Sequence, residues 1–311
     1  MTRTELTSPP IAEAVVPIAS DPAQRVQLPV RMHTGISGSA RRAMTNKVFL
    51  TIVVALGALV MFFPFLWTLI TSISPGAGLA TTPSIIPTNP SLGAYAELFN
   101  RTPFARVVFN SAFLAVAQTV LQLITSSLAA YVFSRLPFKG RGIVFAIYLA
   151  TMMIPMQVLI VPLFTQMRDL HLIDNPLGVL MPSIASAFGV FMLRQAMDGV
   201  PRSLDEAATI DGAGHWRIFS QIILPQMGPT LATLTVFTFM NSWNAFLWPL
   251  VILRSETFQT LPLALAGLQG QFTTQWDVMM AGSVISILPM LAIYLFAQKY
   301  VVQGVASTGI K

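Results

Sequence analysis

Uninterrupted runs of apolar residues alternate with short polar segments along most of the chain. The first run, VFLTIVVALGALVMFFPFLWTLI at residues 48–70, contains no charged residue. Because a helix of about 20 apolar residues crosses the hydrocarbon core of a bilayer, each run of this length predicts a membrane-spanning helix. The runs that are long enough are residues 48–70, 107–133, 143–165, 176–197, 227–252 and 279–300. The pattern therefore predicts an all-α membrane protein with six transmembrane helices.

The amino-acid composition supports a membrane location. Hydrophobic residues account for 54% of the 311 residues and charged residues for 10%, whereas soluble domains carry about 25% charged residues. The mean hydropathy is +0.68. A transmembrane β-barrel would alternate apolar and polar residues in segments of about ten, and these runs are continuous instead. The lack of cysteine excludes disulfides, thiol catalysis and cysteine-based zinc sites.

Lysine and arginine are distributed unevenly between the two sides of the predicted spans. With the N-terminus inside, 14 of the 18 basic residues fall on the inner side. Positive residues accumulate in cytoplasmic loops, so both termini are predicted to be cytoplasmic. The same rule accounts for the net charge of +6 without a nucleic-acid partner. Residues 1–45 are rich in Pro, Ser, Thr and Ala and are predicted to be a disordered cytoplasmic tail, leaving residues 46–311 for the transmembrane domain.

Polar residues recur within the second apolar segment. Ser111, Ala115, Gln118, Gln122 and Thr125 follow one another at steps of three or four residues, so they share one face of a helix. Small and polar residues on a spanning helix belong at helix contacts or along a cavity rather than in lipid. The pattern leaves both interpretations open and makes Gln118 and Gln122 candidates for a substrate path.

The third segment contains two prolines. Pro155 and Pro162 each lack a backbone donor, so they are expected to bend the helix and free carbonyl groups. Gln157 lies between them and is a further candidate for the substrate path, although such bends also occur in static membrane helices.

The fifth segment carries two amides beside an indole. Asn241 and Asn244 are three residues apart and share a helix face, and Trp243 lies between them. These groups can bind a sugar through hydrogen bonds and ring stacking. The alternative is that they form interhelical hydrogen bonds, with the tryptophan near a membrane interface.

Other kinds of site find little support in the sequence. No segment carries a chain of acidic residues, which argues against ion-coupled transport. His33, His171 and His215 lie far apart, so no metal site is expected. No Ser/His/Asp set is placed for hydrolysis, and none of the four lysines follows glycine in the phosphate-binding pattern G-x-x-x-x-G-K-[S/T]. The chain is therefore predicted not to be an enzyme and to carry no cofactor.

The loop at residues 198–226 is unusually rich in polar and small residues. Ser203 followed by Glu206 is a capping-box pattern, which predicts a helix from about Leu204. Gly212 and Gly214 are placed to end that helix in a left-handed conformation. The residues that fall on one face of the predicted helix are Leu204, Ala207, Ala208 and Asp211.

A second short helix is expected to follow the glycines. Trp216, Phe219, Ile222 and Ile223 are predicted to share its apolar face, and Pro225 marks the return towards the membrane. Because helices of about ten residues are marginal alone, they need a surface to pack against. The loop is therefore interpreted as a rigid docking element, and a plain amphipathic surface helix is the alternative.

The loop carries a recognisable motif. Glu206-Ala207-Ala208, three residues, Gly212, nine residues and then Ile222-x-Leu224-Pro225 resemble the EAA motif of the membrane subunits of binding-protein-dependent ABC importers. Over about residues 48–311 the chain is similar to their carbohydrate-type branch, which includes the second maltose permease subunit. The segments that carry this similarity are Asn110-Ser111, SSLAAYVFSRLPFKGRG, MMIPMQVLIVPLF, IDNPLGVLMPSIASAFGVFMLRQ, WNAFLWPL and TLPLAL.

The resemblance implies the ABC type I importer permease fold (MetI-like) and a set of partners. The loop would be the coupling helix that docks in a groove on a cytoplasmic ATPase. The partners would be a homologous second permease, two ATPase subunits that bind ATP-Mg, an extracellular or periplasmic solute-binding protein and membrane lipid. The outer loop near residues 253–277 resembles the one that reaches towards the binding protein. The coupling residues would be Glu206, Ala207, Ala208, Asp211, Gly212, Leu224 and Pro225.

The expected function is that of a permease subunit in a bacterial cell membrane. Together with the second permease it would form the path for a carbohydrate or a related polyol or glycerol phosphate, opened and closed by ATP-driven movements of the ATPases. The alternatives are a permease for another class of solute and a secondary carrier that works without an ATPase.

Overall fold

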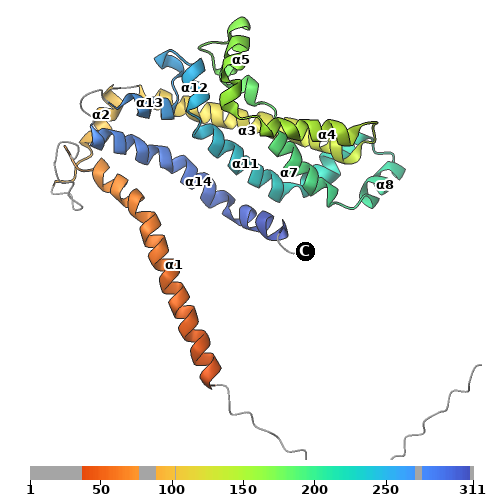
Figure 1. Ribbon diagram of the computed structural model, residues 1–311, viewed down its shortest axis with the longest axis horizontal. Helices are drawn as coiled ribbons and strands as arrows, with labels where there is room; N and C mark the ends of the chain where they lie inside the picture. Colours follow the sequence, from red (N-terminus) through yellow and green to blue (C-terminus); the bar gives the residue numbers. More distant parts are fainter. Residues whose placement is uncertain (1–36, 77–88, 102, 270–274, 309–311) are drawn as a thin grey trace, which may run out of the picture. The chain divides into compact units, whose positions relative to one another are not determined.

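The computed structural model describes residues 37–76, 89–101, 103–269 and 275–308, in which every regular element is a helix (Figure 1). The chain divides into two units, residues 1–60 and 61–311. The α-helices are α1 (Ser37–Ser72), α2 (Gly93–Arg101), α3 (Phe104–Arg135), α4 (Arg141–Ala150), α5 (Met156–Asp169), α6 (Pro176–Leu180), α7 (Ala187–Asp198), α8 (Ser203–Ile210), α9 (His215–Arg217), α10 (Leu224–Gln226), α11 (Gly228–Trp243), α12 (Leu247–Ile252), α13 (Leu261–Gly267) and α14 (Trp276–Thr308). The remaining turns are the 3-10 helices η1 (Thr151–Met153), η2 (Met181–Ser183) and η4 (Glu256–Phe258) and the π-helix η3 (Ile218–Ile223).

Three described helices are long and apolar enough to cross a membrane by themselves. They contain the segments Asn46–Ser72 of α1, Phe104–Arg135 of α3 and Trp276–Gln298 of α14. The first, second and sixth predicted spans fall within these helices. Most of the predicted N-terminal tail, residues 1–36, lies outside the described residues, and α1 already begins at Ser37, so residues 37–45 are helical, in contrast to the expected tail.

The third and fourth predicted spans are bent pairs of helices rather than continuous ones, and α11 of the fifth forms a bent pair with His215–Gln226, a segment that was predicted to belong to the loop. The described residues therefore form up to six spans if each bent pair counts as one. The bends are 99° between Arg141–Met153 and Met156–Asp169, 45° between Pro176–Ser183 and Ala187–Asp198, and 78° between His215–Gln226 and Gly228–Trp243.

Local chemistry explains where these helices break. Pro155 has no N–H to donate and adopts an extended conformation before α5, so the third span breaks there, whereas Pro162 is accommodated within α5. Ser186 restarts α7, because its hydroxyl accepts the backbone N–H of Gly189 at 3.1 Å. The predicted segment 227–252 was too long: α11 ends at Trp243, and Leu247 begins a separate short helix, α12.

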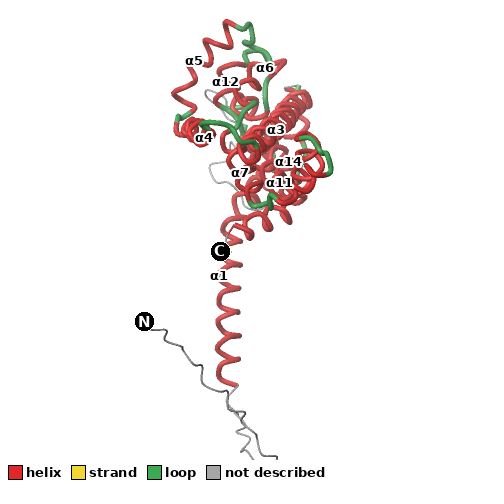
Figure 2. The backbone as a smooth tube through the Cα atoms, turned by 90° about the vertical axis from the view of Figure 1, so that its right-hand side faces the viewer, coloured by secondary structure: helices red, strands yellow, loops and turns green. Residues whose placement is uncertain are grey.

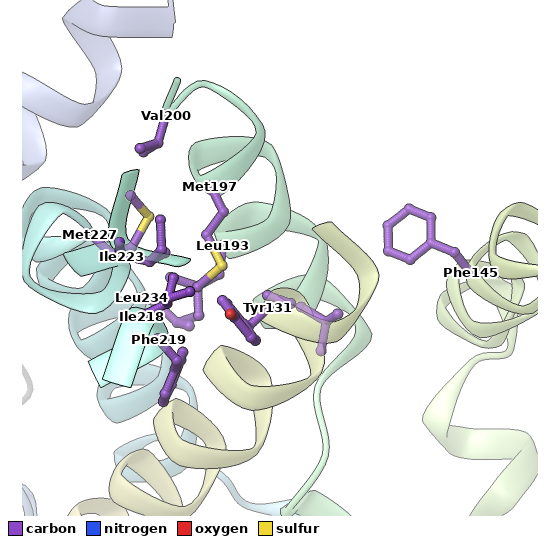
Figure 3. Close-up of a cluster of buried hydrophobic side chains, with 13 residues drawn as sticks. Tyr131, Phe145, Leu193, Met197, Val200, Ile218, Phe219, Ile223, Met227 and Leu234 are labelled. Carbon is purple, nitrogen blue, oxygen red and sulfur yellow. The ribbon is translucent and has the colours of Figure 1, made fainter. Parts of the chain in front are cut away.

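Helix α3 lies at the centre of the second unit. It packs against α7 and α11, and α11 packs in turn against α14 (Figures 1 and 2). Helices α3 and α7 approach closely where Gly189 faces Ser126, because a β-carbon at Gly189 would meet Ser126 Oγ at 2.5 Å. One of the buried clusters joins Tyr131 of α3 and Leu193 of α7 to the π-helix (Figure 3).

Replacement of Gly178 by alanine is expected to destabilise the fold. The added β-carbon would overlap the backbone carbonyl oxygen of Leu172 and press on Ile252, and backbone cannot yield as the end of a side chain can. We expect a loss of about 1–3 kcal/mol of stability, measured as a lower melting temperature of the detergent-purified protein. The matched control is Gly142→Ala in α4, where nothing lies within 4 Å of the new carbon. An unchanged melting temperature for Gly178→Ala would contradict the close packing of α6.

Candidate functional site

Two adjoining cavities lie among α3, α11 and the broken helices. The larger has a volume of about 650 Å³ and the smaller about 320 Å³, and both are lined by Gln118, Phe237 and Asn241. The polar residues that line the larger cavity are Gln118, Gln157, Ser183, Asn241 and Asn244. Those of the smaller cavity are Gln118, Gln122, Ser186, Thr238 and Asn241. The structure thus brings together five of the six residues predicted for a substrate path, and Trp243 is the exception.

Gln122 holds the broken span in place. Its Nε2 donates to the carbonyl oxygen of Ser183 at 2.6 Å, and its Oε1 accepts the hydroxyl of Thr238 at 3.2 Å. Thr125 donates similarly to the carbonyl oxygen of Ile184 at 2.7 Å. These bonds satisfy carbonyl groups where the helix between residues 181 and 187 is interrupted, which a membrane environment requires. Gln122 therefore fixes the shape of the cavity wall.

Three other amides remain available to a ligand. Within the described part of the chain, the side chains of Gln118, Gln157 and Asn241 form no hydrogen bond to protein, whereas Asn244 Nδ2 donates to the carbonyl oxygen of Met240 at 2.8 Å. Gln118 is only 8% exposed, and its amide is accessible from the cavities that it lines. Each amide offers both a donor and an acceptor, which matches the hydroxyl groups of a polar, uncharged solute.

Trp243 packs between helices instead of lining the cavities. It is 1% exposed, its Nε1 donates to the carbonyl oxygen of Ser286 at 3.1 Å, and its ring lies 5.8 Å from that of Phe239. The alternative of interhelical hydrogen bonding therefore describes this residue. Thr238 was missed by the sequence analysis, although its place three residues before Asn241 put it on the same helix face.

The loop between α7 and α11 has a sharp turn after its first helix. Gly212 has a φ of +79° and ends α8 in the left-handed region, as expected, whereas Gly214 has a φ of −77°. The predicted capping box is absent, because Arg202 already has helical dihedral angles and Ser203 lies inside the first turn without a side-chain cap. The second helix is present and runs without a gap from His215 to Gln226, as α9, the π-helix η3 and α10.

The loop presents two large apolar side chains to its surroundings. Ile210 is 86% exposed and Trp216 is 70% exposed. Phe219 and Ile223 point inward into the buried cluster (Figure 3), and Phe219 packs edge-on against Tyr131. Ala208 is buried in the same cluster. The rings of Trp216 and Phe219 pack together with 5.6 Å between their centroids, so the two residues share an apolar face as expected, although much of the indole remains exposed.

The motif residues divide between the two sides of the loop. Glu206, Ala207, Asp211 and Gly212 are exposed together with Pro225, while Leu224 is partly buried. The predicted coupling residues therefore fall into two groups. Most are exposed, like the neighbouring Ile210, whereas Ala208 is buried and Leu224 partly buried.

An arginine at the end of α3 ties this loop to the helix bundle. The Nη2 group of Arg135 donates to the carbonyl oxygens of Met197 and Val200 at 2.8 and 2.9 Å, and its Nε lies 3.2 Å from Asp205 Oδ2. The side chain of Arg135 is 5% exposed. Next to it, the hydroxyl of Ser134 donates to Asp198 Oδ1 at 2.6 Å. Helix α3 therefore carries the cavity amides and, about 20 Å further along, the attachment of α8.

Comparisons with known proteins agree with these features. The family model described as "Binding-protein-dependent transport system inner membrane component" matches residues 122–307. The chain belongs to this family. Its relatives include the arabinooligosaccharides transport system permease protein AraQ of Bacillus subtilis (strain 168), 37% identical, with 85% of this chain and 96% of the relative covered. The lactose transport system permease protein LacG of Rhizobium radiobacter is 34% identical, with 81% and 92% covered.

A solved structure confirms the fold of the permease. A bacterial ABC transporter involved in the import of the acidic polysaccharide alginate matches with a TM-score of 0.75 and 27% identity, over 84% of this chain and 98% of that chain. The chain is a multi-pass membrane protein and a permease subunit of an ABC importer, of the carbohydrate type. This confirms the all-α, MetI-like fold and the family that the EAA motif indicated.

A polar clamp joins two connecting segments of the permease. Asp174 Oδ1 accepts the backbone N–H groups of Ser255 and Arg254, each at 2.9 Å, and the hydroxyl of Ser255 at 3.0 Å. The N–H of Ser255, followed by that of Arg254, lowers the pKa of Asp174 because both bonds favour the charged carboxylate. The clamp positions the start of the loop at residues 253–277, of which residues 270–274 lie outside the described residues.

Proposed function

We propose that this permease subunit forms part of a carbohydrate path that separate ATPase subunits open and close through the loop at residues 198–226. The observation that carries the proposal is the exposure of Ile210 and Trp216 on a loop that Arg135 fixes to the bundle. Large exposed apolar side chains on a rigid element are typical anchors of a protein interface. The groove on the ATPase would receive Ile210, with Glu206 and Asp211 at its polar rim.

The proposed assembly contains this chain, a homologous second permease, two cytoplasmic ATPases that bind ATP-Mg, and an extracellular or periplasmic solute-binding protein. The EAA motif supports the ATPase partner, and the excess of Lys and Arg on one side supports cytoplasmic termini and a cytoplasmic loop. Because the sequence lacks a phosphate-binding lysine motif, ATP hydrolysis is assigned to the partners and no cofactor to this chain.

The cavities favour an uncharged carbohydrate as the solute. Gln118, Gln157 and Asn241 supply unpaired amides, and none of the described residues that line the two cavities is charged. A glycerol phosphate would need a cation for its phosphate group, so this chain fits a neutral sugar better. The relatives named for arabinooligosaccharides and lactose support the same solute class.

Substitution of the cavity amides tests the proposed path. In vesicles that contain the assembled importer, Gln118→Ala and Asn241→Ala are each expected to raise the KM for labelled oligosaccharide about fivefold, because each removes a hydrogen bond worth about 1 kcal/mol. The matched control is Gln195→Ala on α7, an exposed glutamine outside the cavities. An unchanged KM in both variants would assign the amides to packing. Uptake by the permease without any ATPase would support a secondary carrier instead.

A further inference from the structure

The turn between α3 and α4 forms a basic pocket beside the start of α8. The pocket has a volume of about 500 Å³ and is lined by Pro137, Phe138, Lys139, Arg141 and Arg202. Gly140, with a φ of +79°, closes the turn. No acidic residue is among the lining residues, so the pocket presents positive charge alone.

Two of the positive side chains converge on a single carbonyl oxygen. Arg141 Nη1 lies 3.4 Å and Arg202 Nη2 lies 3.1 Å from the carbonyl oxygen of Ser134. The two guanidinium groups therefore lie side by side, and like charges at such a distance repel each other. A carboxylate would normally separate them, and an external anion can take its place.

The nearby carboxylates are already engaged elsewhere. Asp205 pairs with Arg135, and Asp198 pairs with Arg194 and accepts the hydroxyl of Ser134. In the described part of the chain, Lys139, Arg141 and Arg202 have no acidic side chain within ion-pairing distance. The pocket thus keeps an uncompensated positive charge that a phosphate group would neutralise.

The surroundings of the pocket identify the source of such a phosphate. Phe138 is exposed at its rim, and Ile143, Val144 and Ile147 are exposed along the α4 helix that leads away from it. Helix α4 is the first part of the broken third span, so in a membrane these exposed apolar side chains would contact lipid tails and the pocket would lie at the depth of the headgroups. Basic residues beside a spanning helix bind anionic headgroups on the cytoplasmic side.

We propose that this basic pocket binds the phosphate of an anionic phospholipid in the cytoplasmic leaflet. The assignment to that leaflet rests on the proposed orientation of the permease. The lipid phosphate would bridge Lys139 and Arg141 in the α3–α4 turn to Arg202 at the start of α8, while its acyl chains lie along α4. The bound lipid would thereby stabilise the attachment of the docking loop to the bundle.

Native mass spectrometry of the purified permease, extracted from vesicles of phosphatidylcholine with a minor share of phosphatidylglycerol, tests this site. We expect the natural protein to retain phosphatidylglycerol in preference to phosphatidylcholine. Each of the substitutions Lys139→Gln, Arg141→Gln and Arg202→Gln removes one charge and should lower this preference about fivefold. Lys139→Gln alone removes no described hydrogen bond, so it keeps the test valid if the triple variant fails to fold. The matched control replaces three exposed arginines of the opposite side: Arg106, Arg168 and Arg254, each by glutamine.

Several results would overturn the proposal. Equal retention of both lipids by the natural protein would do so, as would unchanged retention in Lys139→Gln and the triple variant. If inorganic phosphate, at matched ionic strength and in phosphatidylcholine alone, stabilised the permease as much as phosphatidylglycerol does, the ligand would be a soluble anion. Because retention is measured without ATP or solute, failure of the lipid site is distinguishable from failure of the proposed transport function.

Discussion

Ile210→Asp is expected to abolish ATP-driven uptake by the assembled importer. Ile210 is the most exposed large apolar side chain of the docking loop, and an aspartate there would bring a charge into the apolar groove proposed on the ATPase. An interface anchor of this kind contributes about 2 kcal/mol or more, so docking should weaken by at least about 30-fold. The measurements are co-purification of the ATPase subunits and uptake of labelled oligosaccharide into vesicles.

The conservative change Ile210→Leu is the matched control and should retain both properties. Trp216→Ala should weaken co-purification in the same way, since the indole is exposed on the second half of the loop. Because Ile210 points away from the bundle, the melting temperature of the permease alone should not change. Normal co-purification and uptake with Ile210→Asp would remove the support for the docking surface.

Arg135→Gln is expected to uncouple ATP hydrolysis from uptake and to destabilise the permease. The change leaves Asp205, which is largely buried, without its cation and removes the donor to the carbonyl groups of Met197 and Val200. Breaking a buried pair by removing one partner costs about 3 kcal/mol or more. The decisive readout is the amount of oligosaccharide taken up per ATP hydrolysed, which a uniform loss of folded protein would not alter.

A double-mutant cycle separates the ion pair from the other bonds of Arg135. If the pair positions α8, Asp205→Asn should recover part of the stability lost in Arg135→Gln, and the two changes should be non-additive. Arg168→Gln is the control, because the Arg168–Asp169 pair is exposed to solvent and such pairs contribute little. Additive effects, with an unchanged ratio of uptake to hydrolysis, would show that Arg135 acts only in folding.

The long spans and the bend at Pro155 could be predicted from the sequence, whereas the break before Ala187 could not. Helices α1, α3 and α14 follow from uninterrupted apolar runs, which alone determine that a segment prefers lipid. The breaks depend on single groups: Pro155 stops α4 and η1, and the hydroxyl of Ser186 restarts a helix within an equally apolar run. Hydropathy averaged over about 20 residues is insensitive to both.

The candidate site shows the same limit. Helical spacing identified the helix faces that carry Gln118 and Asn241, because residues three or four apart lie on the same face. In the structure both faces line the same cavity. Helical spacing could not show whether Trp243 lines the cavity or packs between helices, because an indole suits either role. Its hydrogen-bond partner is the backbone carbonyl of Ser286, which lies 43 residues away in the sequence. Arg135 was missed for a related reason, since Asp205 becomes its neighbour only when α3 and α8 are packed together.

The contact between Gly189 and Ser126 limits how α3 and α7 can move relative to each other. With a glycine set against a serine, α3 and α7 have no room to slide past each other or to admit a lipid tail between them. We therefore expect these two helices to move together if the proposed docking loop is displaced. The part of the cavity wall that we then expect to move is the one where α5 packs against α12 and Met156 and Val158 remain exposed.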